Sequence, residues 1–331
     1  MSRLPPYMQA LQLQGIGKLV EISVPVPVPA DDEVLIQTKA ATICTSDLHD
    51  IKSNPFGILY PRIMGHEGAG VIIQCGADVK DLKPGDRVAS HPVVPCGVCE
   101  ECMRGIGHLC SRMGHSGIDR DGCFAEYFLQ RADRVRKIPA DIPFVTGALL
   151  EPVSVCLEAV YRSGDIKGKS VLVVGDGPFG NMIARLAQKQ GAGRVMIYGR
   201  TPFRLGMIPG AEILDAVPER SVDVAILAVG NAEAAESCIK ALRPRGRMVV
   251  FSAAHQPVLV DLFSVHVLEL EIAGACNDED KIEEALACLG DRSLALEDIV
   301  THQMPFDNWK EAFELARNGH DRALKVALVF E

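Results

Sequence analysis

Four side chains in the first half of the chain could bind one metal ion: Cys44, His66, Glu67 and Glu151. A neutral imidazole is a common metal ligand, and a neighbouring carboxylate can bind the same ion or orient its ligands. Glycines on both sides of the His66-Glu67 pair allow tight turns there. A His-Glu pair by itself is more often solvated or satisfied in a core. The pair together with a thiol and a second carboxylate predicts a metal centre.

A second cluster consists of four cysteines at close spacing: Cys96, Cys99, Cys102 and Cys110. Four thiolates at this spacing can close a tetrahedral shell around Zn²⁺, which leaves no position for water or substrate. We therefore predict a structural zinc site that holds a lobe of loop together. The alternative is four unrelated buried cysteines, which the tight spacing disfavours. We predict that the nearby His108 and His115 are surface residues, because the sulfurs already complete the shell.

A glycine-rich turn in the second half is typical of dinucleotide binding. It follows the apolar run 169–174 and precedes the helical pattern 181–187, the setting that the G-x-G-x-x-G fingerprint requires. The first glycine makes the turn, the second lets a pyrophosphate approach, and the third lets helix and strand pack closely. We expect this turn to bind the cofactor through Gly175, Gly177, Pro178, Phe179 and Gly180.

The end of the next expected strand, 194–198, bears on the choice between NAD and NADP. An NAD-specific fold normally carries an acid there, which accepts hydrogen bonds from the ribose hydroxyls. This chain has Gly199 and Arg200 instead, followed by Arg204. Guanidinium groups can bind a 2′-phosphate, so we predict a preference for NADP. The alternative is that both arginines are ordinary solvated residues. Prolines and glycine in 201–218 indicate that the helix expected there is shortened or lost.

The elements that must position these residues differ between the two halves. Residues 8–40 alternate apolar and polar side chains between prolines, which predicts strands joined by turns, and no long helical pattern precedes residue 144. The runs 222–229, 247–251 and 270–274 are strand-like and partly separated by helical patterns. They predict a parallel, doubly wound sheet. The predicted fold class is α/β, with a mostly-β domain and a dinucleotide-binding domain.

The same patterns suggest the order of domains along the chain. Helices near 279–289 and 307–317 and a strand at 325–329 are expected to return to the first domain. The predicted boundaries are 1–150 for the mostly-β domain with a zinc lobe at about 91–115, 151–278 for the dinucleotide-binding domain, and 279–331 for the return.

Composition limits the class of protein. The 331 residues are 48% hydrophobic with a formal net charge of -9, which argues against a nucleic-acid partner. Residues 1–6 contain no apolar core of a signal peptide, and the apolar runs fall short of the roughly 20 residues of a membrane helix. We therefore expect a cytoplasmic protein. In such a chain, clustered cysteines more often bind metal than form disulfides.

In combination these motifs resemble the zinc-containing medium-chain dehydrogenase/reductase superfamily, and within it the sorbitol, threonine and related polyol dehydrogenases. The resemblance covers nearly the whole length. It is carried by Cys44-x-Ser46-Asp47-x-His49, Gly65-His66-Glu67, the cysteine quartet, Gly122-x-Phe124-Ala125-Glu126-Tyr127, Leu150-Glu151-Pro152 and Gly175-x-Gly177-x-x-Gly180.

The resemblance implies a GroES-like catalytic domain and a Rossmann domain, with two zinc ions per subunit. It implies that Cys44, His66 and Glu67 surround the catalytic zinc, with Glu151 bound directly or through water. Ser46 matches the position that relays the alcohol proton, and His49 matches the position that can pass it to solvent. Relatives assemble through their Rossmann sheets, so we expect a homodimer or homotetramer, with 249–251 and 268–270 as candidate edge segments.

The predicted activity is hydride transfer between a secondary alcohol, such as a polyol, a sugar-derived alcohol or an amino alcohol, and NAD(P), with NADP favoured. The alternatives are a zinc-dependent reductase of small aldehydes or ketones, and a non-catalytic nucleotide-binding regulatory protein. The chain departs from the family at Gly199, in the eroded helix that follows, and at Glu158, where polyol members commonly carry His. These departures concern cofactor and substrate choice more than the reaction class.

Overall fold

The structure is a computed structural model that describes residues 4–253 and 257–331. The chain forms two compact units. The first comprises residues 4–151, Ile282–Asp291 and Val300–Glu331, and the second comprises Pro152–Lys281, apart from 254–256, and Arg292–Ile299. None of the helices in these described ranges is both long and apolar enough to cross a lipid bilayer.

The first unit is built mainly from β-strands, as its alternating sequence predicts. Its strands are β1 (Tyr7–Leu13), β2 (Leu19–Pro25), β3 (Glu33–Thr42), β4 (Arg62–Ile63), β5 (Gly68–Cys75), β6 (Arg87–Ser90), β7 (Val93–Val94), β8 (Gly114–His115), β9 (Tyr127–Arg131), β10 (Val135–Lys137), β17 (Val300–Pro305) and β18 (Lys325–Val329). Its helices are α1 (Thr45–Ser53), α2 (Glu100–Met103), α3 (Phe144–Gly147), α9 (Ile282–Leu289) and α10 (Trp309–Asn318).

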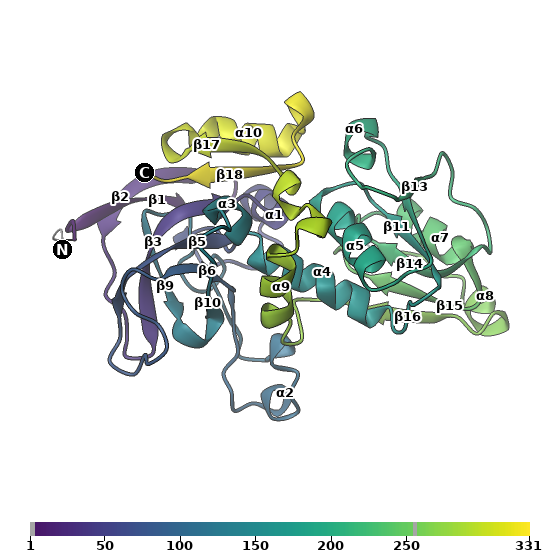
Figure 1. Cartoon of the computed structure of the whole chain (residues 1–331), viewed down its shortest axis with the longest axis horizontal. Helices are drawn as coiled ribbons and strands as arrows, with labels where there is room; N and C mark the ends of the chain where they lie inside the picture. Colours follow the sequence, from purple (N-terminus) through teal and green to yellow (C-terminus); the bar gives the residue numbers. More distant parts are fainter. Residues whose placement is uncertain (1–3, 254–256) are drawn as a thin grey trace. The chain divides into compact units, whose positions relative to one another are not determined.

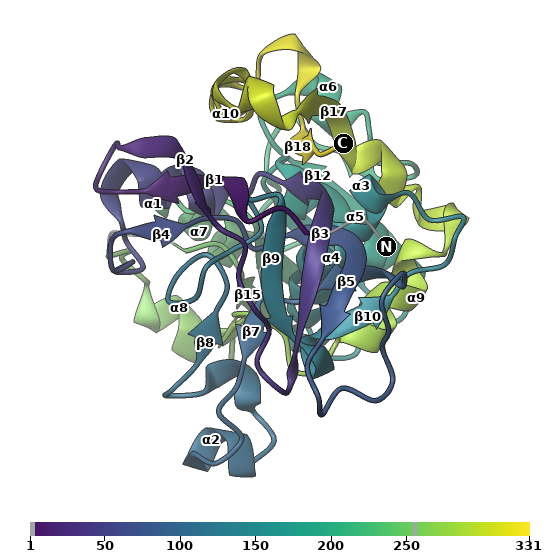
Figure 2. The ribbon, with the colours of Figure 1, turned by 90° about the vertical axis from the view of Figure 1, so that its left-hand side faces the viewer.

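Strand β3 is the centre of the main sheet of this unit, whose order is β10-β6-β5-β3-β18-β17, with β9 also paired to β3. Figure 2 shows β9, β3 and β5 side by side. A smaller sheet has the order β2-β1-β4, and β7 pairs with β8. Because β18 comes from the end of the described chain and pairs with β3, the C-terminal segment completes the main sheet of the unit.

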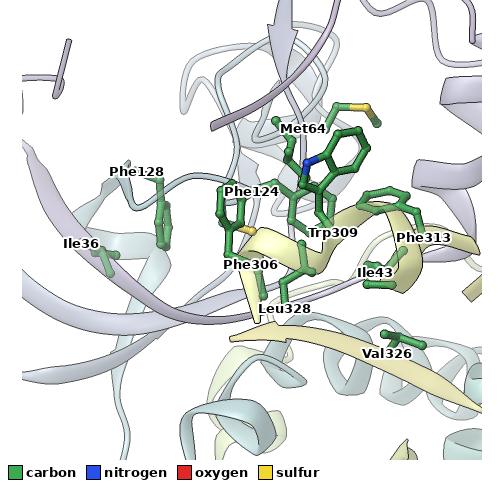
Figure 3. Packing of buried hydrophobic residues seen from close by; sticks show 14 of the residues in the cluster. Ile36, Ile43, Met64, Phe124, Phe128, Phe306, Trp309, Phe313, Val326 and Leu328 are labelled. Carbon is green, nitrogen blue, oxygen red and sulfur yellow. The ribbon is translucent and has the colours of Figure 1, made fainter. Parts of the chain in front are cut away.

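Aromatic side chains of α10 help to hold that return segment in place. The Phe313 ring meets the Phe124 ring edge-on, with centroids 5.5 Å apart, and Trp309 lies edge-on to Phe313 at 6.3 Å. Figure 3 shows these rings with Met64 and Leu328 in one apolar cluster. Burial of such rings is a large hydrophobic contribution, so α10 and β18 are integral to the first unit.

The second unit contains a parallel sheet with helices packed against it (Figure 1). Its strands are β11 (Ser170–Val174), β12 (Arg194–Tyr198), β13 (Glu212–Ile213), β14 (Val222–Leu227), β15 (Leu242–Val250) and β16 (Glu271–Gly274), in the order β13-β12-β11-β14-β15-β16. Its helices are α4 (Leu150–Arg162, from Pro152 onward), α5 (Pro178–Lys189), α6 (Pro202–Leu205), α7 (Ala232–Ala241) and α8 (Leu262–Val267). The predicted α/β class and the doubly wound parallel sheet are confirmed.

Short 3-10 turns connect several of these elements: Gly107–Leu109, Ala132–Arg134, Arg292–Leu294, Leu296–Ile299, Phe306–Asn308 and His320–Arg322. Two of them, within 292–299, belong to the second unit, whereas the sequence suggested that all of 279–331 returns to the first. The reason is a buried cation: Arg185 of α5 donates to the carbonyl oxygens of Leu294 and Ala295, at 2.8 and 2.5 Å.

Two further expectations need correction. A nine-residue helix, α1, precedes residue 144. It has no apolar helical pattern, because two of its three buried residues, Asp47 and Asp50, are polar. The candidate edge segments were also misplaced. The strand β15 lies inside the sheet, paired with β14 and β16, so β16 forms the edge. The helix after β12 is reduced to the four-residue α6, as predicted.

Candidate active site

The pairing of β3 with β5 brings the metal-ligand candidates together. Ala41 is paired with Gly68, and the Thr42 N–H donates to the Glu67 carbonyl at 3.0 Å. Cys44 follows the end of β3, and the His66-Glu67 pair precedes β5. Their Sγ, imidazole nitrogen and carboxylate oxygen lie within 4.8 Å of one another. The chemistry of this set, a thiolate, an imidazole and a carboxylate, suits zinc.

Glu151 contributes a buried carboxylate with one unsatisfied oxygen. It lies in the first turn of α4 and is 7% exposed, and its Oε2 atom has no hydrogen-bond partner among the described residues. Burial, together with the charge of Glu67, raises the pKa of Glu151 to about 7, while the charge of His66 opposes the shift. A buried, unsatisfied oxygen requires a proton or a cation, so Glu151 fits a metal-bound role. It is not part of the group within 4.8 Å, which leaves open a bridging water.

Asp47, which the motif contained but the predicted site did not, orients two of the ligands. One carboxylate oxygen lies 3.3 Å from Nδ1 of His66, and the other accepts the backbone N–H of Cys44 at 2.8 Å. Burial alone would lower the pKa of His66, but the charge and hydrogen bond of Asp47 raise it well above its usual value. Asp47 therefore fixes the imidazole ring, and a metal ion must compete with a proton for it.

The carboxylate of Glu67 is held on both of its oxygens. Lys325 Nζ lies 2.9 Å from Oε1 and 2.8 Å from Oε2, and the Thr42 hydroxyl donates a short hydrogen bond to Oε2. Burial alone would lower the pKa of Lys325, but the charge of Glu67 raises it. This cation lies in β18, 258 residues from Glu67 in the sequence. No sequence signal pointed to it, whereas Asp47 could have been found as the acid three residues after Cys44, in the first turn of α1.

Two histidines predicted at the surface lie in the interior instead. His108 is buried, and His115 is partly buried, with its ring centroid 5.7 Å from that of His66. The pairing of β8 with β7 carries His115 inward, opposite Val93. Burial and the nearby charge of His66 lower the pKa of His115 to about 3, so this ring is neutral beside the metal-ligand cluster.

The two residues expected to move a proton both lie on α1, which starts directly after Cys44. Ser46 is partly buried and His49 is exposed. Their spacing of three residues places them on the same side of the helix. Ser46 is therefore close in sequence to Cys44, and His49 is exposed to solvent. A proton relay from the metal site to solvent needs this arrangement.

The cysteine quartet forms the second metal cluster, with all four sulfurs within 4.8 Å of one another. Sγ of Cys99 lies 3.4 Å from Sγ of Cys102 and 3.5 Å from Sγ of Cys110. A tetrahedral zinc with Zn–S bonds of about 2.3 Å separates its sulfurs by about 3.8 Å, so the spacing fits. A hydrogen bond from the Val98 backbone is the main cause that lowers the pKa of Cys96 to about 6, which favours the thiolate.

The glycine-rich turn has the shape that its fingerprint predicts. Gly175 adopts φ +127°, and a Cβ on Gly180 would lie 1.9 Å from the Gly175 carbonyl oxygen. A Cβ on Gly177, at the N-cap of α5, would meet nothing within 4 Å. The turn therefore needs its first and third glycines for backbone reasons, while the second leaves open space at a helix N-terminus, where phosphate binds well. Pro178 begins α5, and the Phe179 ring packs against Phe251.

The arginines after β12 differ in exposure. The Arg200 side chain is 84% exposed, with the equally exposed Glu233 carboxylate at 3.8 Å. Arg204, in α6, is partly buried, and its carbonyl oxygen accepts from Asn181 Nδ2 at 3.0 Å. Gly199 precedes them and packs against the side chain of Asp176. The structure thus places all three predicted residues in one short segment, from the end of β12 into α6.

Comparison with known proteins relates this site to a catalytic family. Residues 30–140 match the alcohol dehydrogenase GroES-like domain. The chain is 34% identical to the L-threonine 3-dehydrogenase of Pyrococcus horikoshii, covering 92% of this chain and 93% of that protein. It is 31% identical to the sorbitol dehydrogenase of Bacillus subtilis, covering 98% and 97%. A solved structure of a short chain alcohol dehydrogenase from Escherichia coli CFT073, complexed with the cofactor NADH, superimposes with a TM-score of 0.92 at 25% identity, covering 98% of this chain and 100% of that chain.

Proposed function

The chain belongs to the zinc-containing medium-chain dehydrogenase/reductase superfamily, and on that premise we propose that it is a zinc-dependent secondary-alcohol dehydrogenase that uses NADP in preference to NAD. The observation that carries the proposal is the cluster of Cys44, His66 and Glu67 beside the unsatisfied carboxylate of Glu151. A regulatory protein without catalysis would have no need to keep such a set of buried ligands together.

The protein's own groups divide the work of the reaction. When bound at this cluster, zinc would supply a Lewis acid for the substrate oxygen, and a nicotinamide dinucleotide would supply the hydride chemistry. Cys44 and His66 would hold the metal, and Asp47 keeps the imidazole in position. Ser46 takes the proton of the alcohol, and His49 passes it to solvent from the exposed side of α1.

The Lys325 ammonium group has a specific part in this scheme. It balances the charge of Glu67, so that the thiolate of Cys44 and the carboxylates of Glu67 and Glu151 do not leave the site strongly anionic. A site with oxygen ligands suits a hydroxylated substrate, so the proposed class is a polyol, a sugar-derived alcohol or an amino alcohol. The threonine and sorbitol dehydrogenases among its relatives support this class.

Steady-state kinetics tests the proposal. Purified, zinc-replete protein is assayed with polyols, amino alcohols and simple alcohols, each with NAD and NADP, and in reverse with small aldehydes and ketones. We expect oxidation of a hydroxylated secondary alcohol with the higher kcat/KM for NADP. Efficient reduction of small aldehydes alone would support the reductase alternative. No turnover with any substrate, together with tight dinucleotide binding, would support the regulatory alternative.

Assembly and location belong to the same proposal. The edge strand β16 and helix α8 expose apolar side chains, among them Ile272 (45%), Leu262 (73%) and Phe263 (74%), which favours a homodimer or homotetramer through this edge. A monomeric mass by light scattering at micromolar concentration would contradict it. Phe263→Asp should weaken the assembly, whereas Val28→Asp, at an equally exposed apolar residue of the first unit, should not. No disulfide joins the cysteines of the described residues, which agrees with the proposed cytoplasmic location.

A further inference from the structure

An acidic side chain stands at the end of β12, although the residue after that strand is glycine. Asp176 lies between the first two glycines of the glycine-rich turn. Its Oδ2 atom accepts the backbone N–H of Arg200 at 2.9 Å and that of Thr201 at 2.6 Å. The carboxylate thus belongs to the turn after β11 and is hydrogen-bonded to the turn after β12.

This arrangement explains why no side chain follows β12. A Cβ on Gly199 would lie 2.5 Å from Cβ of Asp176 and 2.9 Å from its Oδ2. At such distances a larger residue at position 199 would force Asp176 or the backbone to shift. The Asp176 side chain therefore occupies the space in which an acid at position 199 would begin.

Side chains of α5 hold the segment that follows Arg200. Asn181, Arg185 and Gln188 lie on one face of this helix, at spacings of four and three. Their side chains donate to the carbonyl oxygens of Arg204, Met207 and Pro209, at 3.0, 2.5 and 2.9 Å. The helix after β12 is reduced to α6, and these hydrogen bonds hold the segment where a longer helix would otherwise pack. The turn held by Asp176 is thus continued by a segment that α5 keeps in place.

Charge and hydrogen bonding at this turn oppose an additional phosphate. Successive backbone N–H groups can form an anion site, but those of Arg200 and Thr201 already donate to Asp176. In this fold the end of the second strand faces the adenosine ribose. A 2′-phosphate drawn there by Arg200 would approach a carboxylate that is hydrogen-bonded to the same residue.

We propose that Asp176 is a specificity-determining residue for the dinucleotide, which accepts a ribose hydroxyl and disfavours a 2′-phosphate. This inference rests on the proposed function in one respect, the use of a nicotinamide dinucleotide. It adds that cofactor choice is a competition: Arg200 and Arg204 favour NADP, and Asp176 opposes them. The preference of the wild type for NADP is therefore smaller than the two arginines alone would give.

The test is binding of NADH and NADPH, measured by nicotinamide fluorescence without any substrate. Asp176→Asn removes the charge and retains an oxygen that can accept a backbone N–H. We expect the ratio of the Kd for NADH to the Kd for NADPH to rise at least about tenfold, mainly through tighter NADPH binding. Asp176→Ser, which keeps a shorter acceptor, should change the ratio in the same direction.

Asp165→Asn is the matched control. The Asp165 carboxylate also accepts a backbone N–H, that of Lys167 at 3.1 Å, but it precedes β11 and so lies toward the amino end of the strand. This variant should leave the ratio of Kd values unchanged. Circular dichroism of each variant checks that the second unit is folded.

The possible failures can be told apart. If the wild type binds neither NADH nor NADPH, the proposed function itself is wrong. If both bind but the folded Asp176 variants keep the wild-type ratio, the proposed function stands and the role of Asp176 is overturned. A fall of the ratio, with weaker NADPH binding, would also overturn it, because it would show that Asp176 serves the phosphate by holding the turn.

Discussion

The two metal clusters of the first unit are built in opposite ways. The quartet Cys96–Cys110 comes from one short stretch, on a lobe whose regular structure is limited to β7, β8, α2 and a 3-10 turn. The cluster of Cys44, His66 and Glu67 is set at the ends of the paired strands β3 and β5 and is supported by side chains from elsewhere. In the first cluster the metal organises the chain, and in the second the fold organises the metal ligands.

The largest expected effect is a loss of activity without a loss of stability, at Cys44. Cys44→Ala should lower kcat by about 10³-fold or more, because the substrate oxygen loses its Lewis acid. The change should leave the melting temperature nearly unaltered, since the strands around Cys44 are held by their own ladder. Kinetics and thermal unfolding are measured together, with Cys75→Ala, at the far end of β5, as the control. Substantial turnover by Cys44→Ala would remove the metal from the proposed mechanism.

The second prediction makes the converse change in the cysteine lobe. Cys99→Ala opens a site with no spare ligand, so one zinc should be lost and the free energy of unfolding should fall by more than about 3 kcal/mol. Elemental analysis and limited proteolysis within 91–115 provide the measurements. The comparison between the clusters fails if Cys99→Ala and Cys44→Ala behave alike.

A smaller effect is expected when the support of Glu67 is removed. Lys325→Met leaves that buried carboxylate without its cation, which should weaken zinc binding at the Cys44 cluster by about 10–100-fold. Competition with a chelator measures the affinity, and the zinc of the cysteine quartet serves as an internal reference. Lys310→Met, at an exposed position of α10, is the control. Equal zinc affinities in the two variants would show that Lys325 is only a packing residue.

The smallest effect concerns orientation. Asp47→Asn retains an oxygen for the Cys44 N–H but removes the negative charge beside His66. We expect zinc affinity to fall by about tenfold, with little change in stability. The same chelator titration reports it. An unchanged affinity would mean that the position of the imidazole ring is set by its backbone alone.

The ligands of the two clusters could be predicted from the sequence, but not all of the residues that support them could. Both clusters were predicted because their ligand types are rare in such spacing, and the glycine-rich turn was predicted from its fixed pattern. Lys325 was not predicted, because it lies 258 residues from Glu67 in the sequence. Only the pairing of β18 with β3 brings the two side chains together. The burial of His115 could not be predicted, because the β7–β8 pairing that carries it inward involves only two residues in each strand.

In the glycine-rich turn, the pattern of the sequence did not show the role of Asp176. The fingerprint leaves the residue between its first two glycines free, so Asp176 carried no signal. The absence of an acid after β12, together with Arg200 and Arg204, predicted only a preference for NADP. The contact between Asp176 and Gly199 is a property of the folded backbone. The short helix α6, in contrast, was predictable, because prolines interrupt the segment that contains it.

The origin of Lys325 in β18 has a consequence for biosynthesis. On the ribosome, the cysteine quartet is complete before the second unit is translated, so its zinc can bind to the nascent chain. Glu67 is made even earlier, yet its ammonium partner is added only after the whole of Pro152–Lys281 has been synthesised. We therefore expect an incomplete chain to hold a complete cysteine quartet, while Glu67 of the Cys44 cluster still lacks its ammonium partner.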